Sequence, residues 1–205
     1  MFQNRTQAGR LLAEKLLKYQ KANGIVLAIP RGGVPVGLEI ARALNWPLEL
    51  LLIKKLGHPQ NKEYAIGAVG MQDRIVVPHE EVPESYIESE TERARARLVE
   101  MQQKFMPNKQ PEPIKDRVVI VVDDGIATGN TMLTSVKILR KQEPEAIIIA
   151  APVASWSAVE KLSQEVDKLV LLDVPEEFIG VGRFYSDFAQ LTDSDVINYI
   201  KMSNE

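Results

Sequence analysis

Short apolar runs alternate with longer mixed segments along most of this 205-residue chain. Each run is rich in Val, Ile, Leu or Ala and is long enough for one buried strand, whereas the mixed segments carry apolar residues at helical spacing. The runs predict strands at 25–29, 48–53, 118–122, 146–151 and 168–172, and the mixed segments predict helices at 8–19, 36–44, 84–105, 131–142 and 155–164. This alternation favours an α/β fold, a five-stranded parallel sheet flanked by helices with right-handed crossovers.

The interval between the second and third strands is too long for a simple crossover. Residues 54–64 are polar and interrupted by Gly and Pro, which is typical of a mobile loop, and the short runs at 65–69 and 74–77 predict a hairpin. A charged helix at 84–105 and a proline-containing connector at 106–116 complete the insertion. The expected organisation is one domain over 1–205, with a core at about 22–174, an insertion at 54–116 and a small hood at 175–205.

Two adjacent carboxylates, Asp123 and Asp124, directly follow the third predicted strand. Such a pair is costly to remove from water, so it should face solvent, a metal ion or the hydroxyl groups of a sugar. The turn that follows is rich in small residues and hydroxyls and leads into a helix, whose first N–H groups can bind an anion. Its residues are Gly125, Ile126, Ala127, Thr128, Gly129, Asn130 and Thr131. A phosphorylated sugar fits both features, with its diol at the carboxylates and its phosphate in the turn.

A second glycine-rich turn follows the first predicted strand. Arg31, Gly32 and Gly33 combine a fixed cation with exposed backbone N–H groups, an arrangement suited to pyrophosphate. If the strand order is 2-1-3-4-5, both turns open into one crevice at the point where the order reverses. Taken singly, each motif also fits an ordinary strand–turn–helix connection. The first turn is not a Walker A loop, because no Lys follows Gly129.

The sequence VVDDGIATGNT at 121–131 resembles the phosphoribosyl pyrophosphate (PRPP) signature of type I phosphoribosyltransferases, an acidic pair followed by a turn that ends in T-G-x-T. The motifs PRGGVPVG, KKLG and AIGAV extend the likeness over nearly the whole chain, to a bacterial branch of that family. The resemblance implies a Rossmann-like fold. It also implies transfer of phosphoribose from PRPP to a nitrogen acceptor, with a nucleobase favoured, and release of pyrophosphate with Mg²⁺.

The same resemblance implies a role for each motif. Asp123 and Asp124 would hold the ribose hydroxyls and stabilise the positively charged ring, and Mg²⁺ would contact them directly or through water. Residues 125–131 would bind the 5-phosphate, and residues 31–33 would bind the pyrophosphate. The family's pyrophosphate loop often carries a non-proline cis peptide, which we expect near Arg31 and Gly32. The residues assigned to catalysis are Asp123, Asp124, Arg31 and Lys55.

Two lysines, Lys54 and Lys55, come at the end of the second predicted strand, where relatives often carry Arg-Lys before a flexible loop. They would neutralise the leaving pyrophosphate, although a solvated surface pair has the same sequence pattern. In the loop itself, His58, Lys62 and Glu63 would close over the site and exclude water. His58 is a candidate acid or base because its charge is easily tuned, but a loop His is more often simply solvated.

The acceptor is the least defined part of this hypothesis. Ala127 stands where 6-oxopurine enzymes of the family typically have an Asp that acts on the base, which argues against that mechanism. The segment PEEFIGVGRFYSDF at 175–188 resembles the hood of purine enzymes, in which an aromatic side chain stacks on the base. Candidate stacking residues are Phe178, Phe184, Tyr185 and Trp156, although buried aromatics more often form the hood core.

Composition excludes several other classes of function. The net charge of −3 is spread over interspersed acids and bases, so no nucleic-acid surface or polybasic membrane anchor is indicated. The absence of Cys excludes disulfides and thiolate chemistry, and the polar start of the sequence carries no secretory or membrane-spanning pattern, so we expect a cytoplasmic protein. The sequence does not fix the oligomeric state, but relatives are often homodimers. A PRPP or nucleotide sensor and a phosphoribosyl hydrolase or phosphorylase remain alternatives to the transferase.

Overall fold

The computed structural model describes residues 1–62, 64–77, 81–107 and 109–203. Its main sheet has five parallel strands in the order β2-β1-β6-β7-β8, which confirms the predicted fold class and strand order. The strands are β1 (Gly24–Ala28), β2 (Leu48–Leu50), β6 (Val118–Val122), β7 (Ala146–Val153) and β8 (Lys168–Asp173). The order reverses between β1 and β6, so the two glycine-rich turns start from neighbouring strands.

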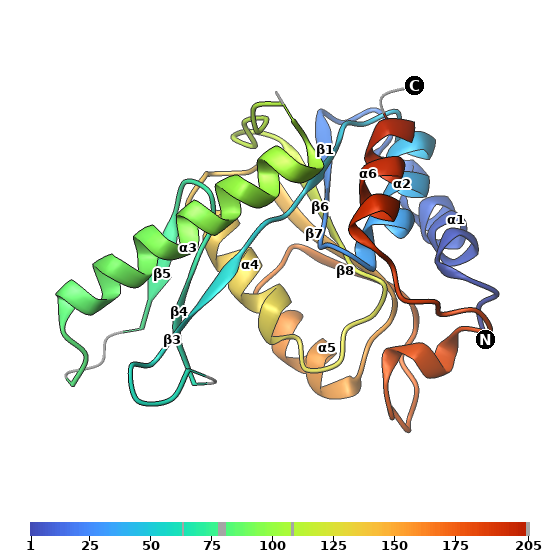
Figure 1. Cartoon of the computed structure of the whole chain (residues 1–205). Coiled ribbons are helices and arrows are strands. Elements are labelled where there is room, and N and C mark those ends of the chain that lie inside the picture. Colours follow the sequence, from blue (N-terminus) through green and yellow to red (C-terminus); the bar gives the residue numbers. More distant parts are fainter. Residues whose placement is uncertain (63, 78–80, 108, 204–205) are drawn as a thin grey trace.

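Helices cover both faces of this sheet (Figure 1). One face carries α1 (Arg5–Leu16), α2 (Gly33–Leu44) and α6 (Asp193–Met202), and the other carries α4 (Asn130–Arg140) and α5 (Trp156–Leu162). Short 3₁₀ turns, η1 (Leu17–Tyr19) and η2 (Val181–Phe184), follow α1 and β8. Strand β6 shows why its sequence is continuously apolar: Val118 and Ile120 pack in the core on the α1 and α2 side, whereas Val119 packs in the core on the α4 and α5 side.

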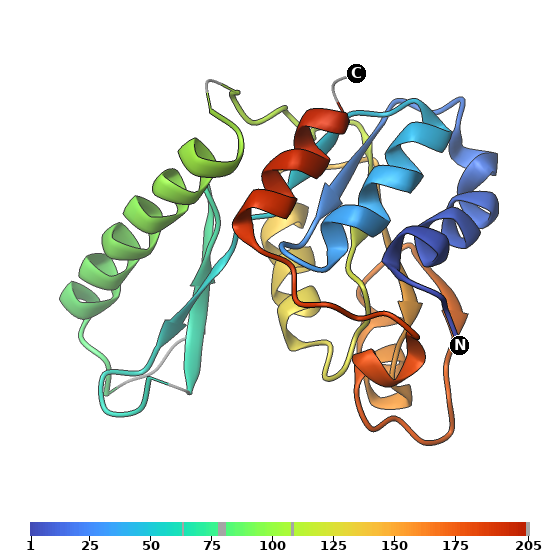
Figure 2. The same cartoon turned by 45° about the vertical axis from the view of Figure 1, so that its right-hand side comes forward.

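The insertion forms a second unit, which we call the arm: a three-stranded antiparallel sheet and one long helix beside the main sheet (Figure 2). Its elements are β3 (Lys54–Gly57), β4 (Ala65–Val69), β5 (Arg74–Val76) and α3 (Glu84–Phe105). The predicted hairpin and helix are confirmed, but the prediction of a loop from residue 54 onward was wrong. Residues 54–57 pair with β4 because Leu56 is buried at 2% exposure and anchors the strand against the arm interior.

The N-terminal segment is bound to the segment between β8 and α6. Phe2 donates its backbone N–H to the Phe184 carbonyl at 2.7 Å and accepts from the Ser186 N–H at 2.8 Å. Its ring lies 5.5 Å from the Tyr185 ring, centroid to centroid. The start of the chain therefore lies against residues 184–186, next to the point where α1 begins.

Candidate active site

The two glycine-rich turns meet at the carboxyl ends of β1 and β6. The Ile29 N–H donates to the Val122 carbonyl at 2.9 Å, which continues the strand pairing into the turns. A Cβ atom on Gly32 would lie 2.0 Å from Asp124 Oδ2, and one on Gly33 would lie 2.5 Å from the Val122 carbonyl oxygen. Only glycine allows this approach. The expected cis peptide bond is confirmed, between Pro30 and Arg31.

Asp123 and Asp124 occupy different environments within the pair. Asp123 accepts the Asp124 N–H at 2.9 Å, and its pKa is raised well above the usual value, first by burial and then by the charge of Asp124. Asp124 instead accepts a hydrogen bond from Arg5 Nε at 2.7 Å, and both side chains are largely buried. Asp124, the carboxylate that lies against Gly32, therefore has its own counter-ion.

Arg5 is held in this position by the segment that follows η2. Its Nη1 donates to the Ala189 carbonyl at 2.9 Å, and its guanidinium lies 3.8 Å from the centre of the Phe188 ring. The Tyr185 hydroxyl donates to the Asp124 carbonyl at 2.6 Å, and burial followed by the charge of Asp124 raises the pKa of Tyr185. Sequence reasoning gave Arg5 no role in the site, because its partner is 119 residues away.

The turn at 125–131, which we call the phosphate turn, is braced by α5. Ser155 donates its Oγ hydrogen to the Ala127 carbonyl at 2.5 Å. Lys161 Nζ donates to the Thr128 carbonyl at 2.7 Å and to Asn130 Oδ1 at 2.6 Å. Gly129 has φ of 71°, a conformation that glycine adopts without strain, and α4 starts at the next residue without a side-chain cap. The Asn130 N–H donates to Thr128 Oγ1 at 3.4 Å, so the N–H groups that follow it in the first turn of α4 are the ones suited to an anion.

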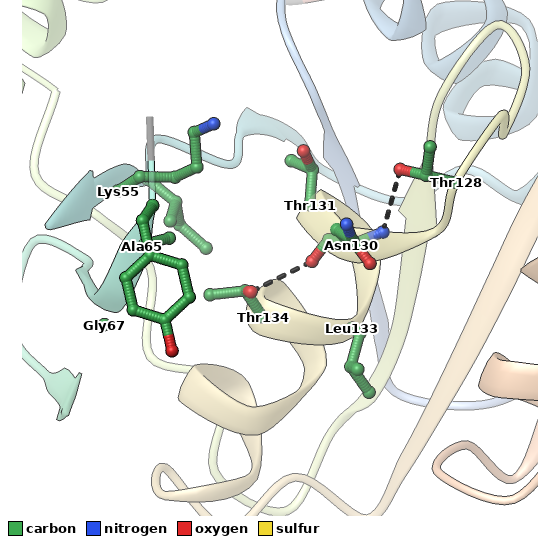
Figure 3. A pocket seen from close by; sticks show the side chains of 10 residues that line it. Lys55, Ala65, Gly67, Thr128, Asn130, Thr131, Leu133 and Thr134 are labelled. Atoms are coloured by element: carbon green, nitrogen blue, oxygen red, sulfur yellow. Dashed lines mark hydrogen bonds between the residues drawn. The ribbon is translucent and has the colours of Figure 1, made fainter. Parts of the chain in front are cut away.

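A cavity of about 520 Å³ separates the phosphate turn from the arm (Figure 3). Thr128, Asn130, Thr131, Leu133 and Thr134 line one side, and Lys55, Ala65 and Gly67 lie on the other. Lys54 and Lys55 belong to β3 and are separated from β2 by residues 51–53, so their predicted place at the end of the second strand was wrong. The structure brings Lys55 to the phosphate turn, across the cavity.

Arg31 lines a different cavity, of about 530 Å³, together with Arg5, Gly32 and Phe188. Its Nε donates to Asp193 Oδ1 at 2.9 Å, and its Nη1 donates to the Leu191 carbonyl at 3.2 Å. The acid pair, with Asp124 against both Gly32 and Arg5, adjoins this second cavity.

The four candidate stacking residues do not share one environment. Phe178 stacks on Phe184 with ring centroids 5.7 Å apart. Tyr185 is buried at 5% exposure, whereas Trp156 begins α5 and is 62% exposed. Stacking among hood residues thus accounts for Phe178 and Phe184, and none of these contacts assigns a base-binding role.

The loop residues of the arm turn towards α3. Lys62 Nζ donates to the Tyr86 hydroxyl at 2.6 Å and lies 3.3 Å from Glu90 Oε2. The His58 N–H donates to the Tyr64 carbonyl at 2.8 Å. Glu63, the remaining candidate from this loop, lies outside the described residues.

A divalent cation would find few protein ligands here. Within the described ranges, no group of three or more His, Cys, Asp or Glu side chains is placed to hold a metal ion. The acid pair supplies hard oxygen donors, but Arg5 already neutralises one of the two carboxylates. This donor set fits Mg²⁺ held mainly by water and substrate oxygens rather than by an all-protein cage. Across the same ranges, no helix combines the length and hydrophobicity that crossing a bilayer requires.

Comparison with known proteins places these features in one family. A family model described as a phosphoribosyl transferase domain matches residues 3–186. The crystal structure of TT1426 from Thermus thermophilus is 38% identical with a TM-score of 0.85, and the match covers 98% of this chain and 97% of that chain. TT1426 therefore has the same fold as this chain over nearly its whole length.

Two curated relatives extend the comparison. Rv0571c of Mycobacterium tuberculosis H37Rv, whose name assigns it provisionally to the phosphoribosyl transferases, is 33% identical over 98% of this chain but only 46% of its own length. The uracil phosphoribosyltransferase of Mycoplasma genitalium is 40% identical over 79 residues, 37% of each protein. The chain thus spans about half the length, or less, of these curated relatives.

Proposed function

Because the chain belongs to the phosphoribosyltransferase family, we propose that it transfers phosphoribose from PRPP to a nitrogen acceptor, with a nucleobase as the first candidate, and releases pyrophosphate. The observation that carries the proposal is the contact between the two turns. Gly32 approaches Asp124 so closely that a loop suited to a diphosphate and an acid pair suited to a ribose diol form one continuous surface. PRPP carries its diphosphate on C1 and its diol on C2 and C3 of the same sugar.

The chemistry requires positioning and electrostatics rather than a covalent nucleophile. Displacement of pyrophosphate from C1 builds positive charge on the ribose and negative charge on the leaving group. In our proposal Asp123 and Asp124 hold the ribose hydroxyls and stabilise the positive ring. The phosphate turn fixes the 5-phosphate through the first N–H groups of α4, and Arg31 receives the leaving pyrophosphate.

Lys55 lines the same cavity as the phosphate turn, so we assign it to the 5-phosphate of PRPP rather than to the pyrophosphate. Mg²⁺ when bound would neutralise charge on the diphosphate, and the acid pair would hold it through water. Arg5 pairs with Asp124 and holds it in place beside Gly32, which lets the acid pair present oxygen acceptors to the sugar. Ala127 at the phosphate turn, in place of a carboxylate, favours an acceptor that needs no acid from that position.

The experiment is release of pyrophosphate from PRPP and Mg²⁺, measured across a panel of purine and pyrimidine bases with a no-base control. Base-dependent release is the expected result and names the acceptor. Release without a base would replace the transferase by a hydrolase, and PRPP binding without any release would replace it by a PRPP sensor. The double variant Asp123→Asn, Asp124→Asn, purified in parallel, controls for contaminating activity.

A further inference from the structure

Asp193 joins the pyrophosphate loop to the arm. Its Oδ1 accepts from Arg31 Nε at 2.9 Å, and its Oδ2 accepts from Lys104 Nζ at 2.5 Å. Arg31 comes from the loop after β1, Lys104 from the last turn of α3, and Asp193 from the first turn of α6. Three elements that are distant in sequence therefore share one carboxylate beside Arg31, which itself lines the second cavity.

The backbone at Asp193 is fixed by a capping box that involves neither of its two cations. Thr192 caps α6, accepting the Asp195 N–H at 3.2 Å, while Asp195 accepts the Thr192 N–H at 2.8 Å. The neighbouring Leu191 carbonyl accepts from Arg31 Nη1 at 3.2 Å. The segment 191–193 thus presents acceptors to Arg31 from a well-defined helix start, and Asp193 is preorganised to hold Lys104 as well.

The charges of this cluster do not balance. Two cations face one carboxylate, and the pKa of Asp193 is lowered, first by its hydrogen bond with Lys104 and then by the charges of Lys104 and Arg31. All three side chains are partly open to solvent, with exposed fractions of 46% for Arg31, 55% for Lys104 and 30% for Asp193. Exposed ion pairs contribute little stability, so a more highly charged anion can replace the carboxylate at small cost.

We propose that Lys104 is a further diphosphate-binding residue and that Asp193 pairs with Lys104 and Arg31 until the diphosphate takes the place of the carboxylate. The inference rests on the proposed function, in which Arg31 receives the pyrophosphate. A diphosphate has two phosphoryl groups and can pair with both cations at once, which a single carboxylate does only by sharing its oxygens. Binding at Lys104 also brings the end of the arm helix into contact with the ligand.

The test is calorimetric binding of pyrophosphate with Mg²⁺, and separately of ribose 5-phosphate, to the full chain and its variants. Lys104→Met should weaken pyrophosphate binding about fivefold, Lys104→Arg should restore most of it, and ribose 5-phosphate binding should not change. Asp193→Asn should tighten pyrophosphate binding about threefold, because the competing carboxylate is removed. Arg97→Met, an exposed charge loss on the same helix, is the matched control.

Each result has a defined meaning. Equal effects of Lys104→Met and Arg97→Met would overturn the assignment of Lys104, since only bulk charge would then matter. Weaker pyrophosphate binding by Asp193→Asn would show that the carboxylate supports Arg31 in the bound state and would overturn the exchange. If the unaltered protein binds neither pyrophosphate nor PRPP, the proposed function itself fails, an outcome distinct from any difference between variants.

Discussion

The two glycine-rich turns are held by contacts of different kinds. The phosphate turn is braced through its backbone, with Ser155 and Lys161 donating to the carbonyls of Ala127 and Thr128. Arg31 in the pyrophosphate loop is instead held through its side chain by Asp193, in an ion pair that is open to solvent. A ligand can leave the first set of contacts intact but competes directly with the second. We infer that the contacts that brace the phosphate turn persist when the 5-phosphate binds. The ion pair that holds Arg31 is instead exchanged for contacts with the leaving pyrophosphate.

The largest effect should come from the acid pair, which both turns share. Asp123→Asn together with Asp124→Asn should lower kcat/KM about 10³-fold, because neutral amides cannot stabilise positive charge on the ribose. The measurement is pyrophosphate release with the acceptor that the base panel identifies. A thermal melt shows whether the variant is folded. Activity close to that of the unaltered protein in a folded variant would reject the ribose assignment.

Separating the two turns should have the next largest effect. Gly32→Ala places a methyl group 2.0 Å from the present position of Asp124 Oδ2, so loop and carboxylate must move apart. Displacement of this size should reduce kcat/KM about 10²-fold. Gly180→Ala is the matched control, because a Cβ there meets nothing within 4 Å. Unchanged activity of Gly32→Ala would mean that the close approach is not needed in the working form.

Removing the counter-ion of Asp124 tests stability rather than chemistry. Arg5→Met leaves a largely buried carboxylate without its charged hydrogen bond, which should lower the free energy of unfolding by about 2 kcal/mol and Tm by about 4–8 °C. Arg10→Met in the same helix removes an Arg that is 69% exposed, and should cost less than about 1 kcal/mol. Equal losses, measured by thermal and urea unfolding, would contradict the buried role of Arg5.

The brace behind the phosphate turn should matter less. Lys161→Met removes hydrogen bonds to Thr128 and Asn130 from an exposed side chain, and should raise KM for PRPP about fivefold with little change in kcat. Lys168→Met, an exposed lysine on β8, provides the control. A fall in kcat without a change in KM would move Lys161 from binding to the chemical step.

The smallest effect should be the pH dependence contributed by Asp193. Because Lys104 and Arg31 hold its folded-state pKa below the usual 3.8, its ion pairs stabilise the fold above that pH and lose this contribution as pH falls through the lowered pKa. The difference in unfolding free energy between the unaltered protein and Asp193→Asn should therefore be constant near neutral pH and disappear in acid. Urea titrations between pH 7 and pH 3 measure it, and a difference that grows in acid would contradict the sign.

Local sequence predicted the parts of the molecule that depend on neighbouring residues. The apolar run at 118–122 is β6 to the residue, and the charged segment at 84–105 is α3, since each pattern is continuous and long enough for its element. Residues 54–57 were mistaken for loop because two lysines and a glycine obscure a strand whose only fully buried large side chain is Leu56. Its partner β4 supplies the pairing, which local composition does not contain.

The residues of the candidate site fall into the same two groups: those that a local motif identifies and those that depend on a distant partner. Asp123, Asp124 and the glycines of both turns could be identified because each motif is contiguous and its backbone chemistry is local. Arg5 and Asp193 could not, because each acts on a partner more than a hundred residues away, and a single Arg or Asp at a helix start has an ordinary capping or surface interpretation. Only the meeting of α1, α6 and the turns gives them a role.

The partners of Asp124 also set an order of assembly for the growing chain. Its carboxylate is neutralised by Arg5, which is synthesised early, and its carbonyl is bound by Tyr185, which is synthesised late. Both glycine-rich turns can therefore be complete on the ribosome while the segment that seats Arg5 over Phe188 has yet to emerge. Neutralisation of Asp124 by a seated Arg5 therefore has to wait for residues 185–189, which follow both turns in the sequence.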